Sequence, residues 1–339
     1  MTEENKIIAQ KIWQEIEKAQ NILLHCHQNA DGDSVASALA TMHMLEGLGK
    51  KVTIIRGDTS IPRAYHHFPG FEKIVMKNYF EISISKFDLF IIQDSSTKDR
   101  VSRLQNIIFP ESLRTVVIDH HDTNTLFGEI NLIDAQAPAT ASILFELFKL
   151  WKINITKEIA LSLLIGMYDD TGGFQYQSTT SSTFEMAAEL STVVPDYHET
   201  ILMMHNMLDP KQMEFIALAL NSIEHYFSNK LALAAISHQS LQSHGIAKRD
   251  TTGVDISNRL RSVIGWDLDI AMTEYEEGEI GVSLRTRDEN MYDLTKIVTP
   301  LGGGGHKAAA GIYLKMDLES AKKLLLDTIQ KVYPHLGTP

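Results

Sequence analysis

The sequence predicts an α/β fold: a Rossmann-like, mostly parallel sheet in an N-terminal domain, then a helical linker and a smaller α/β domain. Over the first 170 residues, short apolar runs without polar alternation, typical of buried parallel strands, alternate with helical stretches. Met-rich helical sequence follows, and strand-like segments return near residue 230. We therefore expect three parts, at residues 1–180, 181–225 and 226–339.

The elements of the N-terminal domain follow in order along the chain. A helix over residues 4–19 comes first, because its isoleucines recur at helical spacing. Strands are expected at 21–24, 51–55, 87–92, 115–118 and 131–133. Further helices are expected at 34–48, 140–149 and 157–167. Strands that alternate with helices in this way form a mostly parallel sheet.

The C-terminal domain is predicted from a second set of such segments. Strands are expected at 231–236, 268–273 and 280–285, and helices at 254–264 and 318–332. Between the last strand and the last helix lies the run of four glycines at 302–305, the one low-complexity feature of the chain.

Composition excludes several classes of function. The 339 residues carry a net charge of -12, which disfavours binding of duplex DNA through clustered Lys and Arg. The single cysteine, Cys26, excludes an internal disulfide and favours a reducing compartment. The sequence has no apolar run of about 18 residues and no signal-peptide core. We therefore expect a cytoplasmic protein with no membrane partner.

Residue types that bind metals follow three predicted strands and one predicted helix. They are His27 with Asp31 and Asp33, then Asp94, then Asp119-His120-His121, and lastly Asp169-Asp170. The carboxyl ends of parallel strands share one edge of a sheet, so these side chains are expected to converge. Mixed imidazole and carboxylate ligands suit Mn²⁺, Fe²⁺ or Zn²⁺, and their number suggests two ions that share a carboxylate.

Each of these residues also has a plainer reading when it is taken alone. Asp31 and Asp33 are compatible with a turn, because Asp-Gly is a common turn sequence. Asp94 precedes two serines and is compatible with a helix N-cap, and one of Asp169 and Asp170 with a cap. The metal hypothesis therefore depends on the joint pattern.

In their order, the motifs resemble the DHH phosphoesterases. The motifs are His27-x-x-x-Asp31-x-Asp33, Asp94, Asp119-His120-His121 and Asp170-Thr171-Gly172. Residues 302–311, Gly-Gly-Gly-Gly-His-Lys-Ala-Ala-Ala-Gly, resemble the signature of the DHH-associated C-terminal domain. The likeness covers nearly the whole chain. It is nearest to the stand-alone oligoribonuclease and pAp-phosphatase branch and to the cyclic-di-AMP and pApA phosphodiesterases.

The resemblance implies a role for each motif residue. One ion would be bound by His27 and Asp31, a second by Asp33, His120 and Asp170, and Asp94 would bridge the two. His121 would act on the phosphoryl group, and Asp119 would orient a histidine. The family usually uses Mn²⁺, with Mg²⁺ or another divalent ion as an alternative. Ala30 and Ala36 depart from the family's frequent Pro and Gly, and neither departure removes a ligand.

The C-terminal domain is expected to bind the substrate. Successive glycines can turn their amides inward to form an anion-binding concavity, which assigns Gly303, Gly304, Gly305 and His306 to substrate binding. The alternative interpretation of this glycine run is a flexible linker with no role in binding. The family likeness assigns Arg285 to the substrate as well. Strand alternation puts Arg287 on the same face, so either arginine is suited to a terminal phosphate.

These observations lead to one functional expectation. The chain is expected to hydrolyse short oligoribonucleotides, linear dinucleotides such as pApA, or pAp to mononucleotides, with a hydroxide activated by two metal ions. The alternatives are a cyclic-di-AMP phosphodiesterase, an inorganic pyrophosphatase or exopolyphosphatase, and an inactive nucleotide sensor. The oligomeric state is not determined by the sequence, and a homodimer is one possible state.

Overall fold

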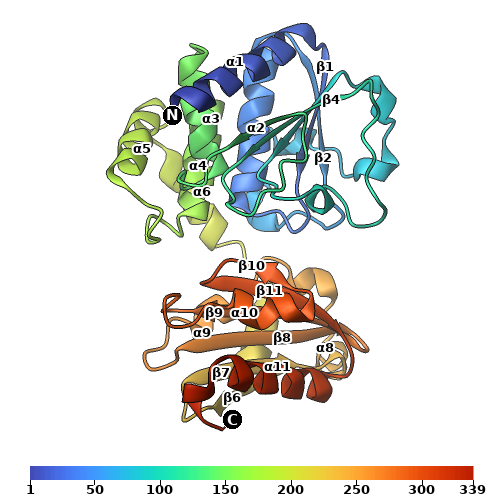
Figure 1. Cartoon of the computed structure of the whole chain (residues 1–339), viewed down its shortest axis with the longest axis vertical. Helices are drawn as coiled ribbons and strands as arrows, with labels where there is room; N and C mark the ends of the chain where they lie inside the picture. The colour runs from blue at the N-terminus through green and yellow to red at the C-terminus, as the bar shows by residue number, and fades with distance from the viewer. Residues whose placement is uncertain (339) are drawn as a thin grey trace. The chain divides into compact units, whose positions relative to one another are not determined.

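The computed structural model describes residues 1–338, which divide into two compact units, Met1–Met207 and the described residues from Leu208 onward. The first unit contains a five-stranded sheet and the second a six-stranded sheet (Figure 1). Both units combine helices with a sheet, so the predicted α/β class is confirmed. No helix in residues 1–338 has the length and apolar character needed to cross a membrane.

The sheet of the first unit is entirely parallel. Its strands are β1 (Asn21–Cys26), β2 (Lys51–Arg56), β3 (Leu89–Gln93), β4 (Arg114–Asp119) and β5 (Ile130–Ile133). They lie in the order β2-β1-β3-β4-β5, so the sheet's central strand is β3. The strands β1, β3 and β4 are apolar and buried on both faces, as the uninterrupted hydrophobic runs predicted.

Helices cover only one face of this sheet. The helices are α1 (Glu3–Lys18), α2 (Gly32–Gly47), α3 (Thr140–Leu150), α4 (Lys157–Asp170), α5 (Ser181–Val193) and α6 (Tyr197–His205). Alternate strand residues such as Leu24 and Ile91 pack with these helices in one core. The intervening residues, such as Leu23 and Phe90, pack on the other face against residues 79–88 and 94–113, which form loops and short 3-10 turns.

The boundary between the units falls within the predicted linker. Helices α5 and α6 belong to the first unit, whereas α7 (Pro210–Asn221) belongs to the second. The last residues of that stretch form an edge strand, β6 (Ile223–Tyr226), so the expectation that residues 181–225 are wholly helical is wrong there. A linking role for these helices stays a prediction.

The sheet of the second unit is mixed. Its remaining strands are β7 (Leu231–Ile236), β8 (Leu268–Glu276), β9 (Glu279–Thr286), β10 (Gly304–Gly305) and β11 (Ala309–Lys315). They lie in the order β10-β11-β9-β8-β7-β6, and only β7 and β8 are parallel. The helices are α8 (His238–Ser243), α9 (Ile256–Leu260), α10 (Thr295–Val298) and α11 (Leu318–Val332).

Besides β6, the short helices α8 and α10 were not predicted, and two further parts of this unit differ from the prediction. Strands β10 and β11 were missed, because a glycine run followed by alanines carries no strand pattern. The helix expected over 254–264 is the five-residue α9. It is short because the amides of Ser262 and Val263 bond to carbonyls three residues back, and Gly265, with φ of 93°, turns the chain toward β8.

Candidate metal centre

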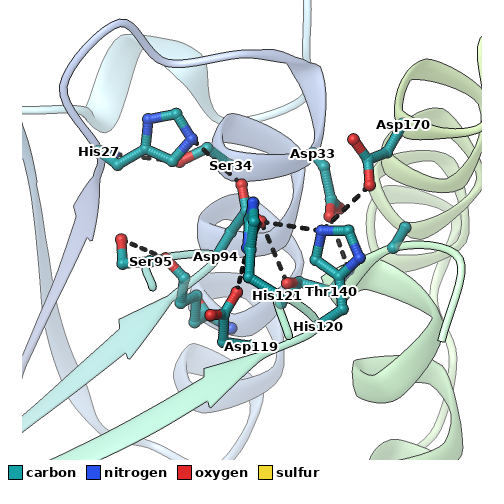
Figure 2. A network of polar contacts seen from close by, with 12 residues as sticks. His27, Asp33, Ser34, Asp94, Ser95, Asp119, His120, His121, Thr140 and Asp170 are labelled. Carbon is teal, nitrogen blue, oxygen red and sulfur yellow. Dashed lines mark hydrogen bonds and ion pairs between the residues drawn. The ribbon is translucent and has the colours of Figure 1, made fainter. Parts of the chain in front are cut away.

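The predicted ligands of the first unit do meet at the carboxyl edge of its sheet. His27 follows β1, Asp31 is the N-cap of α2 and Asp33 lies in the first turn of that helix. Asp94 follows β3, Asp119 ends β4, and His120 and His121 come directly after it. Asp170 is the last residue of α4. Figure 2 shows Asp94 between His27 on one side and Asp33, His120 and Asp170 on the other, with these side chains coming from separate elements.

Asp94 lies at the centre of the group and is almost fully buried. Its Oδ2 lies 3.2 Å from His27 Nε2, and its Oδ1 lies 3.5 Å from His120 Nε2. Its backbone has a φ of 51°, a left-handed conformation that Asp and Asn adopt more readily than most residues. That conformation lets the Asp94 amide still donate to the Ile118 carbonyl while the carboxylate faces both histidines. Asp94 therefore contacts both halves of the centre.

The first half contains His27 and Asp31 beside Asp94, with ligand atoms of the three residues within 4.8 Å of one another. His27 Nε2 lies 3.5 Å from Asp31 Oδ2, and its Nδ1 lies 2.9 Å from the Gln28 carbonyl, to which it donates. Burial disfavours charge on this ring, but the carboxylates of Asp31 and Asp94 together outweigh burial and raise the pKa of His27 to about 9. Nε2 is therefore the nitrogen directed at the acidic side chains.

The second half contains Asp33, His120 and Asp170, whose ligand atoms also lie within 4.8 Å. His120 Nε2 is 3.1 Å from Asp170 Oδ2. Burial opposes charge on His120, but Asp94 and Asp170 hold the pKa of His120 well above its usual value. Burial, with Asp94 second, raises the pKa of Asp33 to about 7, and burial raises that of Asp170 well above the ordinary range. Burial also opposes charge on Asp94, but hydrogen bonds from His120 and His27 hold the pKa of Asp94 well below its usual value. The carboxylates of this cluster therefore depend on nearby positive charge.

The N-terminus of α3 holds Asp33 in place. The amides of Thr140 and Ala141 donate to its two oxygens at 2.6 and 3.0 Å, and the Ser37 hydroxyl donates at 3.0 Å. First-turn amides of a helix suit a carboxylate, because they have no partner within the helix. Gly166 of α4 packs tightly here, since a Cβ there would lie 2.7 Å from Asp33 Oδ1. Asp33 is thus positioned from α2, α3 and α4 together.

His121 is oriented by Asp119. Its Nδ1 lies 2.7 Å from Asp119 Oδ1, and the Asn124 side-chain amide donates to Asp119 Oδ2 at 2.7 Å. Asp119 is completely buried, so this bond directs the Nε2 side of the ring away from the sheet. His121 Nδ1 lies 3.8 Å from Asp94, farther than the Nε2 of either His27 or His120.

The adjacent acids Asp169 and Asp170 have different surroundings. Asp170 contacts His120, whereas Asp169 Oδ2 accepts a 2.7 Å hydrogen bond from the Gly32 amide. A Cβ at Gly32 would lie 2.6 Å from the Asp169 carboxyl group, so only glycine fits between Asp31 and Asp33 without a shift. Asp169 therefore ties the loop that bears Asp31 and Asp33 to the end of α4.

The donor set fits divalent metal ions. Four carboxylates and two imidazoles, three of these six side chains buried, surround one small volume, and the His121 ring and Arg100 lie beside them. Such a cluster is unfavourable without a bound cation, and its nitrogen and oxygen donors suit Mn²⁺, Fe²⁺ or Zn²⁺. Two groups of possible ligands, one with His27 and one with Asp33, coincide with the sets that the family resemblance implied, and a further group joins Asp94 and His120 to Asp119 and His121.

The residues predicted to bind substrate lie in the second unit. Arg285 of β9 is ion-paired with Asp255, the N-cap of α9, at 2.7 Å. The expected concavity of inward-facing glycine amides is wrong in part, because the amides of Gly302 and Gly303 bond to the Thr299 and Val298 carbonyls.

Two glycines of the loop at residues 302–305 are required for close packing. A Cβ at Gly303 would lie 2.5 Å from the Gly311 carbonyl oxygen. Gly305 has a φ of 137°, and a Cβ there would lie 2.5 Å from the Ala309 carbonyl oxygen. Gly302 and Gly304 have open space on the Cβ side, and Gly304, without the left-handed φ of 88° that Gly302 has, is the one proposed to face a neighbouring group. His306 follows, and its amide donates to Ala309.

Sequence reasoning missed three residues that shape the centre. Asn124 bonds to Asp119, Thr140 donates to Asp33, and Arg100 contacts the His27 ring. Of these three residues, only Thr140 could have been recognised from the sequence, because it begins a predicted helix, where backbone amides are available to an anion.

Comparison with known proteins agrees with the motifs. Residues 21–167 match the DHH family, N-terminal domain, and residues 244–333 match the DHHA1 domain. The "Bifunctional oligoribonuclease and PAP phosphatase NrnA" of Thermus thermophilus is 28% identical over 323 residues, which cover 93% of this chain and 91% of that protein. The protein of the same name in Bacillus subtilis is 23% identical, with 90% and 93% covered.

A solved structure has the same fold. The crystal structure of an exopolyphosphatase-related protein from Bacteroides fragilis matches with a TM-score of 0.86 and 22% identity over 98% of each chain. At this identity the likeness concerns the fold alone.

Proposed function

Because the chain belongs to the DHH family of phosphoesterases, metal-dependent hydrolases of phosphate esters, we propose that it hydrolyses short oligoribonucleotides, linear dinucleotides such as pApA, and pAp to mononucleotides. Two Mn²⁺ ions at the centre of the first unit are the proposed cofactor. Relatives named as oligoribonucleases and PAP phosphatases, matched over most of their length, support this substrate class.

The observation that carries the proposal is the position of Asp94. One of its oxygens is near His27 and the other near His120, so one carboxylate faces both ligand groups. A carboxylate shared between two ions is the arrangement used by enzymes that cleave phosphate esters with a pair of metals. Its two groups contain His27 with Asp31, and His120 with Asp33 and Asp170.

Bound ions at these ligands would supply a water of lowered pKa as the nucleophile and would offset the charge of the phosphoryl group. The other parts of the mechanism belong to the chain. Asp33, held by three donors, keeps the ligand geometry rigid. Asp119 keeps the proton on His121 Nδ1 and thereby presents Nε2 to the phosphoryl oxygens, where a protonated ring would stabilise developing negative charge.

The proposal gives the second unit the role of binding the nucleotide. Arg285 is suited to a terminal phosphate because its planar guanidinium pairs with two oxygens at once. Its present partner Asp255 would be exchanged for that phosphate. Gly304, which has open space beside it, and His306 are the parts of the glycine loop proposed to contact the substrate.

A side-by-side assay tests the proposed function. Purified protein with Mn²⁺ is given pAp, pApA, cyclic di-AMP, a five-nucleotide RNA and inorganic pyrophosphate in separate reactions. We expect release of AMP from pAp and pApA and of mononucleotides from the RNA. Cleavage of pyrophosphate alone would overturn the proposal in favour of a pyrophosphatase, and cleavage of cyclic di-AMP alone would favour a cyclic-dinucleotide phosphodiesterase.

A further inference from the structure

Three cationic residues lie on the short segment that follows Asp94, and their surroundings differ. Lys98 Nζ lies 4.8 Å from the centre of the Phe109 ring. Arg103 Nε is paired with Asp99 at 2.9 Å and is about half exposed. Arg100, which ends the 3-10 turn η5 (Lys98–Arg100), instead places Nη2 3.1 Å from His27 Nε2. Arg100 is thus the one of these cations that points into the metal centre.

The contact between Arg100 and His27 is made on the face of the ring. Arg100 Nη2 lies 3.1 Å from Nε2 and 3.3 Å from Nδ1. An atom in the ring plane at nearly equal distance from both nitrogens would collide with the carbon between them. Nδ1 is in addition already bonded to the Gln28 carbonyl. The in-plane direction of Nε2, toward Asp31 and Asp94, is therefore not taken by the guanidinium.

Arg100 also has no acidic partner of its own. Within residues 1–338, no carboxylate oxygen lies within 4.0 Å of its guanidinium, although its side chain is half-buried. A guanidinium stays charged at any physiological pH and carries five donors in a planar fork. Leaving such a group half-buried without an anion is unfavourable, and phosphate is the anion that its shape fits well.

The backbone holds this side chain in place. The Gln28 amide donates to the Arg100 carbonyl at 3.0 Å, which joins the segment to the loop after β1. Asp58 accepts from the Ser102 hydroxyl and from the Arg103 amide, both at 2.7 Å. Substitution of the Arg100 side chain leaves all three bonds intact, so its variants are expected to fold.

We propose that Arg100 is a substrate-binding residue, whose guanidinium binds a phosphoryl oxygen of the nucleotide beside the ligands His27, Asp31 and Asp94. The proposal rests on the proposed function and adds a phosphate contact supplied by the first unit. It is separate from Arg285, which lies in the second unit. The competing explanation is that Arg100 only balances the negative charge of the acidic ligands.

Binding of AMP separates these explanations, because AMP carries the phosphate but is not turned over. Wild type, Arg100→Gln, Arg100→Lys and the matched control Arg103→Gln are loaded with Mn²⁺ and titrated with AMP by calorimetry. Mn²⁺ binding without nucleotide is measured on the same proteins, together with kcat and KM for pApA. We expect Arg100→Gln to raise the Kd of AMP and the KM by about 10- to 100-fold, with Lys intermediate and Arg103→Gln unchanged.

The affinity for Mn²⁺ shows whether Arg100 contacts the phosphate or only balances the charge of the acidic ligands. An unchanged Mn²⁺ Kd in Arg100→Gln, to within about threefold, supports a contact with the phosphate itself. An unchanged Kd of AMP in this variant, or an equal change for Mn²⁺ and AMP, would overturn the proposal in favour of charge balance. If wild type binds AMP but does not cleave pApA, the proposed function fails while the AMP titration still decides the role of Arg100. Absence of AMP binding to the Mn²⁺-loaded wild type would overturn the proposal as well.

Discussion

The metal centre of the first unit and the substrate face of the second differ in how their charges are satisfied. In the metal centre, four carboxylates crowd around two imidazoles, and burial holds the pKa of Asp33 and Asp170 above the ordinary range. In the second unit, Arg285 is paired with Asp255 at 2.7 Å, and the amides of Gly302 and Gly303 have carbonyl partners.

This difference indicates that the metal centre depends on a bound ion for stability, whereas the substrate-binding residues of the second unit do not. The metal centre is a set of like charges that a divalent cation would stabilise, whereas Arg285 and the glycine loop are stable by themselves. Loss of a metal ligand is therefore expected to reduce catalysis itself. Changes in the second unit are expected to alter the affinity for substrate.

The largest effect is expected at Asp94. Asp94→Asn keeps the size of the side chain and tolerates the left-handed backbone, but it removes the charge that faces both histidines. We expect kcat for pApA to fall by roughly 1,000-fold or more, with an unchanged circular dichroism spectrum. Asp99→Asn, five residues later and exposed, is the control. Activity near the wild-type level in Asp94→Asn would exclude a bridging role.

A smaller effect is expected at the ion pair of the second unit. Arg285→Gln should raise KM by about 10- to 100-fold and change kcat little, because a binding contact to phosphate is lost. Asp255→Asn keeps the N-cap of α9 and releases Arg285 from its charged partner, so KM should stay the same or fall. Steady-state kinetics with pApA measures both. An equal loss of kcat and kcat/KM in Arg285→Gln would instead place this arginine in the transition state.

The smallest effect concerns stability at Asp269 of β8. This carboxyl group is fully buried and neither oxygen has a hydrogen-bond partner within residues 1–338. Burial, opposed by Arg287 and Arg261, raises the pKa of Asp269 to about 7 from an ordinary value of 3.8. The unfolded chain loses this proton first, so the contribution of Asp269 to stability is fully present below about pH 4 and is lost as the pH rises through 7.

Asp269→Asn removes this dependence on pH. Between pH 4 and pH 7, the free energy of unfolding of wild type should fall relative to the variant by on the order of 2 kcal/mol. Urea denaturation at both pH values measures this difference, with Asp267→Asn, on a more exposed neighbour, as the control. Parallel pH profiles for wild type and Asp269→Asn would show that the Asp269 carboxyl group is not perturbed.

The sequence carried most of the information about the metal centre. Asp119, His120 and His121 interrupt an apolar run at the point where a parallel strand ends, and polar residues there have few structural reasons to occur. Sheet topology then brings them to the edge where His27 and Asp94 also lie. The strands β1, β3 and β4 were predictable because buried strands have uninterrupted hydrophobic runs, and the more exposed β2 and β5 because short apolar runs alternate with helical sequence.

Other contacts had no pattern in the sequence. Asp255 and Arg285 are 30 residues apart and meet only because α9 packs beside β9. Arg100 looks like its neighbours Lys98 and Arg103, and only the turn η5 decides which of the three faces His27. The strands β10 and β11 were missed because their glycines and alanines are held by pairing, of β11 with β9 and of β10 with β11, and not by local propensity.

The stoichiometry of Mn²⁺ binding tests the two-ion centre most directly. Metal-free protein is titrated with Mn²⁺ by calorimetry, and bound ions are counted by electron paramagnetic resonance. We predict two ions per chain in wild type and one in Asp170→Asn, because this variant weakens the group of Asp33 and His120 and leaves that of His27 and Asp31 intact. A single ion in saturated wild type, or an equal loss of both ions in Asp170→Asn, would contradict the account.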